Sequence, residues 1–251
     1  RPTRMRPLLL PATTGPIAGL LCGSLSSQPC LPDGSLQISE PGPFTYDGTP
    51  QYAQGDLDAD GWQDVVVAFD SDGPEPDRYL ATLMGNGESF DPPTIYSDPD
   101  LIHDGLVLAD FDGDGALDVV TVGRYANSIG EPGRLSVYRN SGDGTLAPPD
   151  DLSLPERAWA VCAADLRGDD ALDLAVLLDG PSLPANTSAV LILSNDGSGG
   201  FLPTTTLQVP APGRHVVAGD VDADGDADLV AACGTELVVL LNNGVSGFAA
   251  W

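Results

Sequence analysis

A nine-residue segment rich in aspartate occurs four times in this chain and constrains the fold more than any other feature. Its clearest copy is Asp-Phe-Asp-Gly-Asp-Gly-Ala-Leu-Asp at residues 110–118, and the four copies begin at residues 56, 110, 165 and 220. Successive copies are therefore 54, 55 and 55 residues apart. So regular a period predicts stacked or radial repeats, in which each repeat is one supersecondary unit.

The order of residues in the segment suits a hard cation. In 110–118 carboxylates stand at positions 1, 3, 5 and 9, and Gly115 at position 6 permits a backbone turn that other side chains disfavour. Ca²⁺ takes about 6 to 8 oxygen ligands, and four aspartates, the carbonyl oxygen of Ala116 and a water would complete that shell. Each complete copy is thus a candidate calcium site.

The third copy is altered. Asp165, Asp169 and Asp173 are kept, but Arg167 stands at position 3 and Asp170 replaces the glycine. A guanidinium at position 3 removes one ligand, puts positive charge where the ion would lie and can itself neutralise the remaining carboxylates. We expect the loop Asp165–Asp173 to be metal-free.

Composition limits the classes of partner. The chain has 251 residues, is 42% hydrophobic and carries a net charge of −27, which three calcium ions would reduce only to −27 + 6 = −21. So acidic a protein is unsuited to nucleic acid and to anionic membrane surfaces. No apolar run reaches the roughly 18 residues of a membrane-spanning helix, so we expect no membrane insertion.

The strand pattern predicts an all-β fold. A short β-branched or aliphatic run follows each aspartate segment, for example residues 119–122, and a second run such as 135–138 ends in a turn rich in Asn and Gly. Runs of this kind read as buried strands joined by hairpins. No long helical period occurs. We expect each unit to begin at this Asn/Gly turn, so that the strand after it opens the unit and leads to the strand before the aspartate segment. About four strands per repeat correspond to one blade of a β-propeller.

The loop D-x-D-x-D-G-x-x-D, followed by an apolar strand and later by Asn-x-Gly-x-x-Phe, resembles the FG-GAP/VCBS repeats of integrin α-subunit heads and of many bacterial surface proteins. The resemblance covers residues 33–251 and implies a β-propeller with calcium in the loop between two strands of a blade. The ligands that it implies, including the backbone carbonyl of position 7, are Asp56, Asp58, Asp60, Trp62 and Asp64 in the first copy; Asp110, Asp112, Asp114, Ala116 and Asp118 in the second; and Asp220, Asp222, Asp224, Asp226 and Asp228 in the fourth.

Two regions are expected. Residues 1–32 contain three arginines and no acidic residue, and form either a remnant of an export segment or a basic arm that docks on an acidic neighbouring subunit. Residues 33–251 form the propeller. The stretch 35–46 could complete the last blade and close a four-bladed ring; alternatively the chain belongs to a longer one or shares its ring with another subunit.

Four cysteines match no zinc pattern. Cys22 and Cys30 are close enough in sequence for a disulfide if the protein is exported, whereas Cys162 and Cys233 lie in apolar strands and are expected to be buried thiols.

No enzyme motif accompanies the two histidines, His103 and His215, and we expect a non-catalytic protein. Calcium sites with the millimolar affinity of extracellular modules would stay nearly empty in cytosol, which favours a secreted or cell-surface location. The expected function is a calcium-stabilised interaction module for adhesion, recognition or assembly, with a protein or glycan ligand and self-association through the arm. The alternatives are a propeller lectin, for which Trp62, Trp159 and Tyr125 could stack on sugars, and an accessory domain of a secreted hydrolase.

Overall fold

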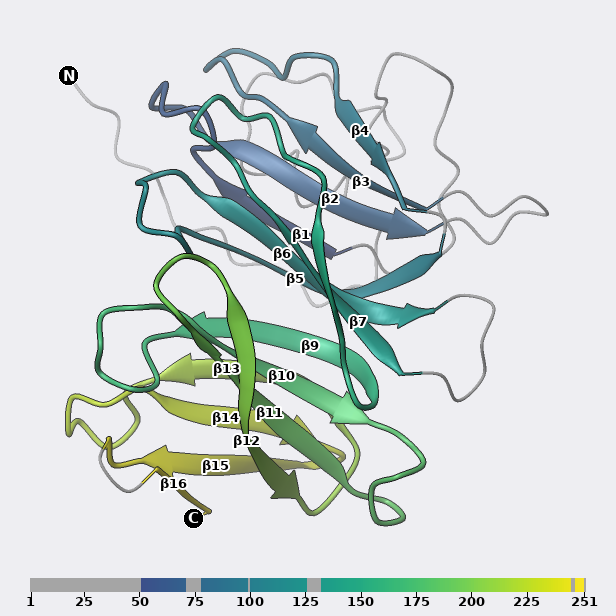
Figure 1. Ribbon diagram of the computed structural model, residues 1–251, viewed down its shortest axis with the longest axis vertical. Helices are drawn as coiled ribbons and strands as arrows, with labels where there is room; N and C mark the ends of the chain where they lie inside the picture. Colours follow the sequence, from purple (N-terminus) through teal and green to yellow (C-terminus); the bar gives the residue numbers. More distant parts are fainter. Residues whose placement is uncertain (1–50, 71–77, 99, 126–131, 245–246, 251) are drawn as a thin grey trace.

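The structure, a computed structural model, describes residues 51–70, 78–98, 100–125, 132–244 and 247–250. These residues form four antiparallel sheets and no helix (Figure 1). Accordingly, the described part of the chain has no helix long and apolar enough to cross a bilayer. The arm 1–32, the stretch 35–46, Cys22 and Cys30 lie outside the described residues.

Each sheet has four strands that are consecutive in the chain. The strands of sheet 1 are β1 (Gln51–Gly55), β2 (Asp64–Asp70), β3 (Arg78–Leu83) and β4 (Thr94–Ser97). Those of sheet 2 are β5 (Leu101–Ala109), β6 (Asp118–Tyr125), β7 (Gly133–Tyr138) and β8 (Asp150–Ser153). Those of sheet 3 are β9 (Arg157–Ala164), β10 (Asp173–Asp179), β11 (Ser188–Asn195) and β12 (Phe201–Val209). Those of sheet 4 are β13 (Gly213–Gly219), β14 (Asp228–Cys233), β15 (Glu236–Asn242) and β16 (Phe248–Ala250).

The second strand of each sheet explains the apolar runs in the sequence. In β6 the first six residues are all buried, because one face packs on the preceding sheet and the other on the following one. Val119 belongs to the core between sheets 1 and 2, and its neighbour Val120 to the core between sheets 2 and 3. Successive side chains on a strand point to opposite faces, so only a continuous apolar run can fill both cores.

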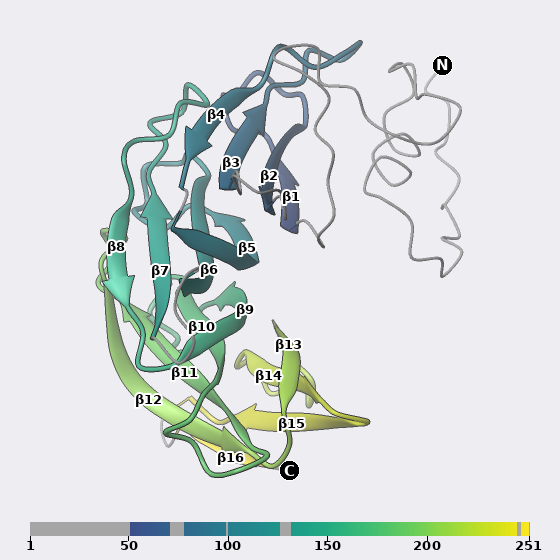
Figure 2. The same cartoon turned by 90° about the vertical axis from the view of Figure 1, so that its right-hand side faces the viewer.

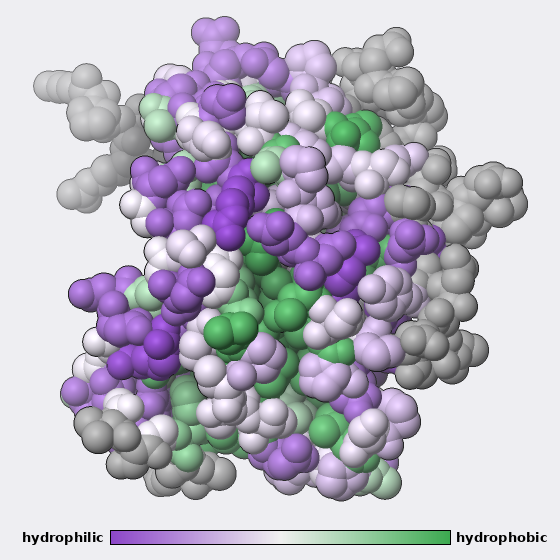
Figure 3. All heavy atoms as spheres, in the orientation of Figure 1, coloured by the Kyte–Doolittle hydropathy of each residue, from purple (hydrophilic) through white to green (hydrophobic). Residues whose placement is uncertain are grey.

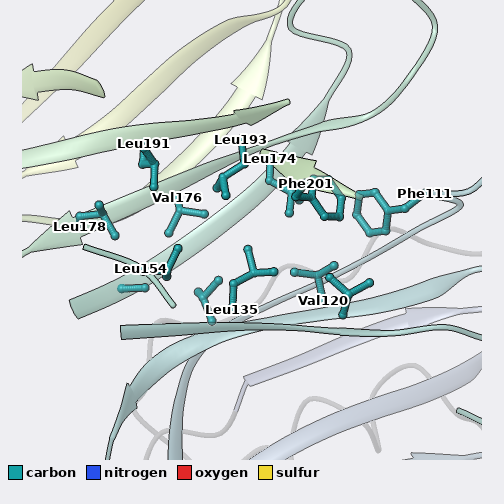
Figure 4. Packing of buried hydrophobic residues seen from close by; sticks show 13 residues of the cluster. Phe111, Val120, Leu135, Leu154, Leu174, Val176, Leu178, Leu191, Leu193 and Phe201 are labelled. Carbon is teal, nitrogen blue, oxygen red and sulfur yellow. The ribbon is translucent and has the colours of Figure 1, made fainter. Parts of the chain in front are cut away.

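The sheets follow one another along an arc, as the blades of a propeller do (Figure 2). Their first strands lie side by side, with β5 in contact with β1 and β9, and β9 in contact with β13. Between sheets 2 and 3 the core is a layer of interdigitated aliphatic side chains with Phe111 and Phe201 edge to face at 5.4 Å (Figure 4). This confirms the expected all-β architecture of four-stranded blades.

The frame of the repeat differs from the expected one. The strand after each Asn/Gly turn was expected to open a new unit, but β12 pairs with β11 and is the last strand of its own sheet. In sheet 4 that place is taken by β16, which pairs with β15. Sheet 4 thus has its fourth strand without residues 35–46. Sheets 1 and 4 stand at the two ends of an open arc (Figure 2).

Candidate metal sites

Every aspartate loop joins the first strand of a sheet to the second, so the four loops lie on one side of the arc. They form the left edge of the molecule in Figure 1, and in the same orientation hydrophilic residues gather along this edge (Figure 3). A loop with this placement is positioned by the two strands on which it stands. The loops therefore stand at equivalent places from blade to blade.

The structure brings carboxylates together in the three complete loops. In each of them three aspartates offer oxygens that all lie within 4.8 Å of one another. These triads are Asp56, Asp58 and Asp64; Asp110, Asp112 and Asp114; and Asp220, Asp222 and Asp228. An all-oxygen donor set of this size fits Ca²⁺ and not the softer transition metals.

Position 5 carries a predicted ligand in each complete loop, and of these three aspartates only Asp114 belongs to a triad. Asp60, Asp114 and Asp224 at position 5 each accept a hydrogen bond from the position-7 amide, at 2.8, 2.8 and 2.9 Å. Because a carboxylate has two oxygens, these bonds leave one oxygen free for an ion. The position-7 residues are Trp62, Ala116 and Asp226, whose carbonyls were the predicted backbone ligands. Their ligand role stays a prediction.

Backbone amides preorganise the loops. In the second loop Asp110 accepts bonds from the amides of Gly113 and Gly115 at 2.7 and 3.0 Å, and Asp112 accepts one from the amide of Asp114 at 3.2 Å. Gly115 has a φ of 91°, as a position-6 glycine requires. Partial loss of hydration within the cluster, followed by the nearby charges of Asp224, Asp228 and Asp220, raises the pKa of Asp222 in the fourth loop. A cation between these carboxylates would relieve that repulsion.

The position-9 aspartates have a structural role that the sequence did not reveal. Asp118 is fully buried and accepts bonds from the amides of Phe111, at 3.2 Å, and Asn140, at 2.9 Å. The same pair of bonds, to loop position 2 and to the turn after the third strand, is made by Asp64, Asp173 and Asp228. Burial raises the pKa of Asp118, while these two amide bonds act in the opposite direction. Position 9 thus fastens the loop to the next hairpin in all four blades.

Arg167 fills the third loop. Its guanidinium lies 2.9 Å from Asp169 and 3.1 Å from Asp173, and Nη2 donates to the carbonyl oxygen of Asn195 at 2.6 Å. The expected ion pairs of Arg167 therefore exist with Asp169 and Asp173. Asp165 is held instead by the amides of residues 167–170, which outweigh its burial and lower its pKa. In the third loop, therefore, the guanidinium of Arg167 bridges two carboxylates. In each of the other loops, three carboxylates come together at the equivalent place.

A second element that the sequence did not reveal is an asparagine at the start of the turn after the third strand, which we call the turn asparagine. It is Asn140, Asn195 and Asn242 in sheets 2, 3 and 4, and is at most 3% exposed. Its side-chain amide donates to the carbonyl of loop position 2 in the preceding blade: Leu57 at 2.7 Å, Phe111 at 2.8 Å and Leu166 at 2.9 Å. A second bond reaches its own loop, to the carbonyl of Leu117, Leu172 or Ala227 at 3.1 Å. The turn asparagine therefore links neighbouring blades at their aspartate loops.

The histidines and cysteines are where packing predicts. His103 is 3% exposed, and burial followed by the charges of Arg134 and Arg78 lowers its pKa to about 4. Its neighbour Asp104 pairs with Arg124 at 3.1 Å. Cys233 is a free thiol buried in the core between sheets 3 and 4, as expected, whereas the free thiol Cys162 is only partly buried against that core.

The three aromatic residues that were expected to stack on sugars, all of them described, do not gather into one platform. Trp159 is covered on its ring by Arg214 and Arg124, whose guanidinium carbons lie 4.0 and 4.9 Å from the ring centre. Trp62 is 52% exposed and its ring lies over Gly87 in the neighbouring turn. Tyr125 has Arg134 at 5.9 Å from its ring centre. These contacts are typical of side chains that pack against their neighbours and cover the edges of the sheets.

A pocket of about 340 Å³ lies between sheets 1 and 2, away from the loops. Its wall includes Tyr96, Tyr138 and an ion pair between Arg134 and Asp98, and Asp151 accepts a bond from Ser136 at 2.7 Å. Burial, followed by the charge of Asp98, raises the pKa of Tyr138. The pocket combines aromatic surface with buried charges.

Four-stranded antiparallel sheets in an arc, each with an aspartate loop between its first two strands, define a protein of the β-propeller class. The chain belongs to the FG-GAP-like repeat family, whose pattern matches residues 56–121, 125–176 and 182–231, more than half of its length.

Two solved structures are similar at low identity. One is an Agrocybe aegerita lectin, described as recognising non-reducing terminal N-acetylglucosamine, with 17% identity and a TM-score of 0.45 over 80% of this chain and 64% of the lectin. The other is a Photorhabdus luminescens Tc holotoxin pore, with 18% identity and a TM-score of 0.29 over 79% of this chain and 12% of the toxin chain. The chain thus spans less than two thirds of either protein. A comparison with curated proteins found no match.

Proposed function

We propose that this protein is a non-catalytic, calcium-stabilised interaction module that works outside the cell. One observation carries the proposal: each of three loops brings carboxylate oxygens of three aspartates within 4.8 Å of one another, while the one loop without this arrangement has a guanidinium bound to its carboxylates. The positive charge of Arg167 in the altered third loop marks the equivalent place in the three complete loops as a cation site. The altered loop is a control within the molecule.

Calcium would act on the fold and not on a reaction. The ligands stand on a loop whose last aspartate holds the next hairpin, and whose second residue binds the next blade. An ion in the loop would therefore stabilise a junction between blades. Because the same junction recurs around the arc, the ions would serve the whole scaffold.

The proposed location follows from affinity. Extracellular calcium modules have Kd values of about 10⁻⁴ to 10⁻³ M, at which millimolar calcium would add on the order of 0.5 to 1.5 kcal/mol per site. Cytosolic calcium would leave such sites nearly empty. A module that uses several weak ions for stability is suited to an extracellular setting.

Calorimetric titration of the metal-free protein with Ca²⁺, together with thermal melting in chelator and in millimolar calcium, tests the proposal. We expect three bound ions and a higher melting temperature in calcium. Asp222→Asn should remove one site, whereas Asp169→Asn in the altered loop should leave the number at three. No heat of binding and identical melting curves would refute the role of calcium.

The ligand of the module is proposed to be a protein or a glycan. A glycan-binding role is favoured by the pocket between sheets 1 and 2, because aromatic walls with charged hydrogen-bonding groups suit a hydroxylated ring. Binding to a glycan array that is lost in Tyr96→Ala, but kept in Trp62→Ala, would support the pocket. If the array shows no binding, a protein ligand is left.

Self-association through the basic arm is part of the proposal and rests on charge alone. Residues 1–32 have three arginines and no acidic residue, whereas the whole chain has a net charge of −27. Deletion of residues 1–30 should then shift an oligomer to a monomer in size-exclusion chromatography. An unchanged elution volume would refute the docking role of the arm.

A further inference from the structure

The face of sheet 4 that points away from sheet 3 is apolar and exposed. Leu237 is 71% exposed, Val217 58% and Val221 52%. The register places Val217 beside Val230, Val230 beside Val239, and Leu237 beside Ala232, so Val217 and Leu237 lie on one face. Val221 stands at position 2 of the aspartate loop between β13 and β14. The opposite face, with Leu229, Ala231 and Leu240, is buried against sheet 3.

Equivalent residues in sheets 1 to 3 show what the corresponding face of those sheets contacts. In the other blades the residue four positions after the position-9 aspartate is Ala68, Val122 or Leu177, and it is at most 1% exposed. Its partner on the third strand, Leu80, Leu135 or Val190, is 0% exposed. Every one of these residues packs against the following blade. Leu237 is the equivalent of this partner in sheet 4, where the face has no following blade among the described residues.

The aspartate loops indicate independently that sheet 4 lacks the contact with a following blade that sheets 1 to 3 make. Loop position 2 is Leu57, Phe111 and Leu166 in sheets 1 to 3, with exposures of 1%, 2% and 4%, and its carbonyl accepts the bond from the next turn asparagine. In sheet 4 the residue is Val221, and no turn asparagine among the described residues reaches its carbonyl. Sheet 4 thus presents an exposed apolar face and the backbone carbonyl of Val221, the two features that bind the following blade in sheets 1 to 3.

Sheet 1 does not supply that blade. Its position for the turn asparagine is Gly85, whose amide binds Asp64 at 2.7 Å as the amide of Asn140 binds Asp118. A Cβ atom at Gly85 would lie 2.3 Å from the carbonyl oxygen of Gln63, so no side chain fits there. The two ends of the arc are therefore not complementary.

We propose that the open face of sheet 4, formed by Val217, Val221, Val230, Leu237 and Val239, is the docking surface for a further blade of the same repeat type. This blade follows sheet 4 as sheet 4 follows sheet 3. It presents an apolar strand face to Leu237 and carries a turn asparagine that donates to the carbonyl of Val221. The surface continues the series of interfaces between blades and does not depend on calcium.

The test adds a blade of known sequence to the full chain. A copy of residues 213–250 is joined after Trp251 through a linker that reproduces the three-residue spacing between β12 and β13. Hydroxyl-radical footprinting then reports side-chain exposure. Labelling of Leu237 should fall to the level of its buried equivalents Leu80 and Leu135. Leu202, which is 67% exposed on β12, should keep its labelling and serves as the control in the same sample.

Unfolding in urea gives a second readout. The m value of the extended chain should be about a quarter larger, since one blade is added to four and the m value scales with the surface exposed on unfolding. Replacing the turn asparagine of the added copy with alanine should lower the stability of the extended chain. Leu237→Asp should prevent docking of the added blade while leaving the fold of the natural chain intact.

Two results would overturn the inference. One is an added blade that is digested by protease while Leu237 keeps its full labelling. The other is a dimer of the natural chain, measured by light scattering, that Leu237→Asp converts to a monomer, because the occupant of the face would then be a second copy.

Discussion

The side-chain amide of Asn140 donates a hydrogen bond to the carbonyl oxygen of Leu57, 2.7 Å away and 83 residues earlier in the chain. The backbone amide of Asn140 also binds Asp118, so a single residue joins its own aspartate loop to the loop of the preceding blade. The equivalent bonds of Asn195 and Asn242 repeat this link along the arc.

Asn195→Ala should destabilise the protein strongly. The substitution removes bonds to the carbonyls of Phe111 and Leu172 and leaves buried acceptors unpaired, which costs about 2 to 4 kcal/mol. Urea denaturation measures the change. Asn86→Ala, in an exposed turn of sheet 1, is the matched control and should cost less than about 1 kcal/mol. Equal effects of the two substitutions would contradict the linking role.

Asp118→Asn and Asp114→Asn should have different consequences. Asp118 accepts two buried amide bonds, and an asparagine side chain can accept only through its single oxygen, so about 1 to 3 kcal/mol should be lost in chelator as well as in calcium. Asp114→Asn should change metal-free stability little and weaken calcium binding. Chelator melts and calorimetry on both variants measure this. A loss for Asp118→Asn that appears only in calcium would make Asp118 a ligand and nothing more.

Arg167→Ala should destabilise sheet 3 without regard to calcium. It removes the guanidinium from Asp169, Asp173 and the carbonyl of Asn195, at an expected cost of about 1 to 3 kcal/mol. Melting in chelator and in calcium should show the same decrease. A decrease that added calcium reverses would instead mean that the emptied loop accepts the ion.

Restoring the motif should create a fourth site. Arg167→Asp combined with Asp170→Gly gives the loop the same pattern of aspartates and glycine as the other three, and Asp170 already has the positive φ of 66° that position 6 requires. Calorimetry should then count four calcium ions in place of three. A count that stays at three would show that the surroundings, and not the motif, determine binding.

Stability should fall with acid partly through His103. Its folded-state pKa of about 4 lies below the unfolded value of 6.5, so the unfolded chain takes up the proton first. This contribution is intact above about pH 6.5 and is lost as the pH falls toward 4, up to about 3 kcal/mol in total. Urea denaturation at pH 7 and pH 4.5 should show a smaller loss for His103→Gln than for the natural chain.

The repeat spacing made the blades predictable. An aspartate loop and an apolar strand are local patterns, and their recurrence every 54 or 55 residues required equivalent structures. The strands that follow Asp64, Asp118, Asp173 and Asp228 begin where the sequence placed them. Arg167 was also predictable, because a charge of opposite sign at a ligand position has few roles.

Contacts between blades were not predictable from local pattern. An Asn followed by Gly is a hairpin signal, and nothing near Asn140 indicates a bond to Leu57 in another repeat. A comparison of equivalent positions, with asparagine at 140, 195 and 242 but glycine at 85, was the signal that could have revealed it. Likewise, a periodic sequence does not fix where a unit begins, and only the pairing of β12 with β11 assigns that strand to its sheet.

Arg167 differs from a bound ion in being part of the polypeptide. A covalently tethered cation has no dissociation constant and cannot be chelated or diluted away, so the third loop would stay assembled at any calcium concentration. If the other loops take calcium as proposed, a drop in calcium would loosen the loops of sheets 1, 2 and 4, while the third loop kept its bond from Asn242 to Leu166 and so its junction with sheet 4. The molecule would then come apart in a set order, with sheet 3 the last to loosen.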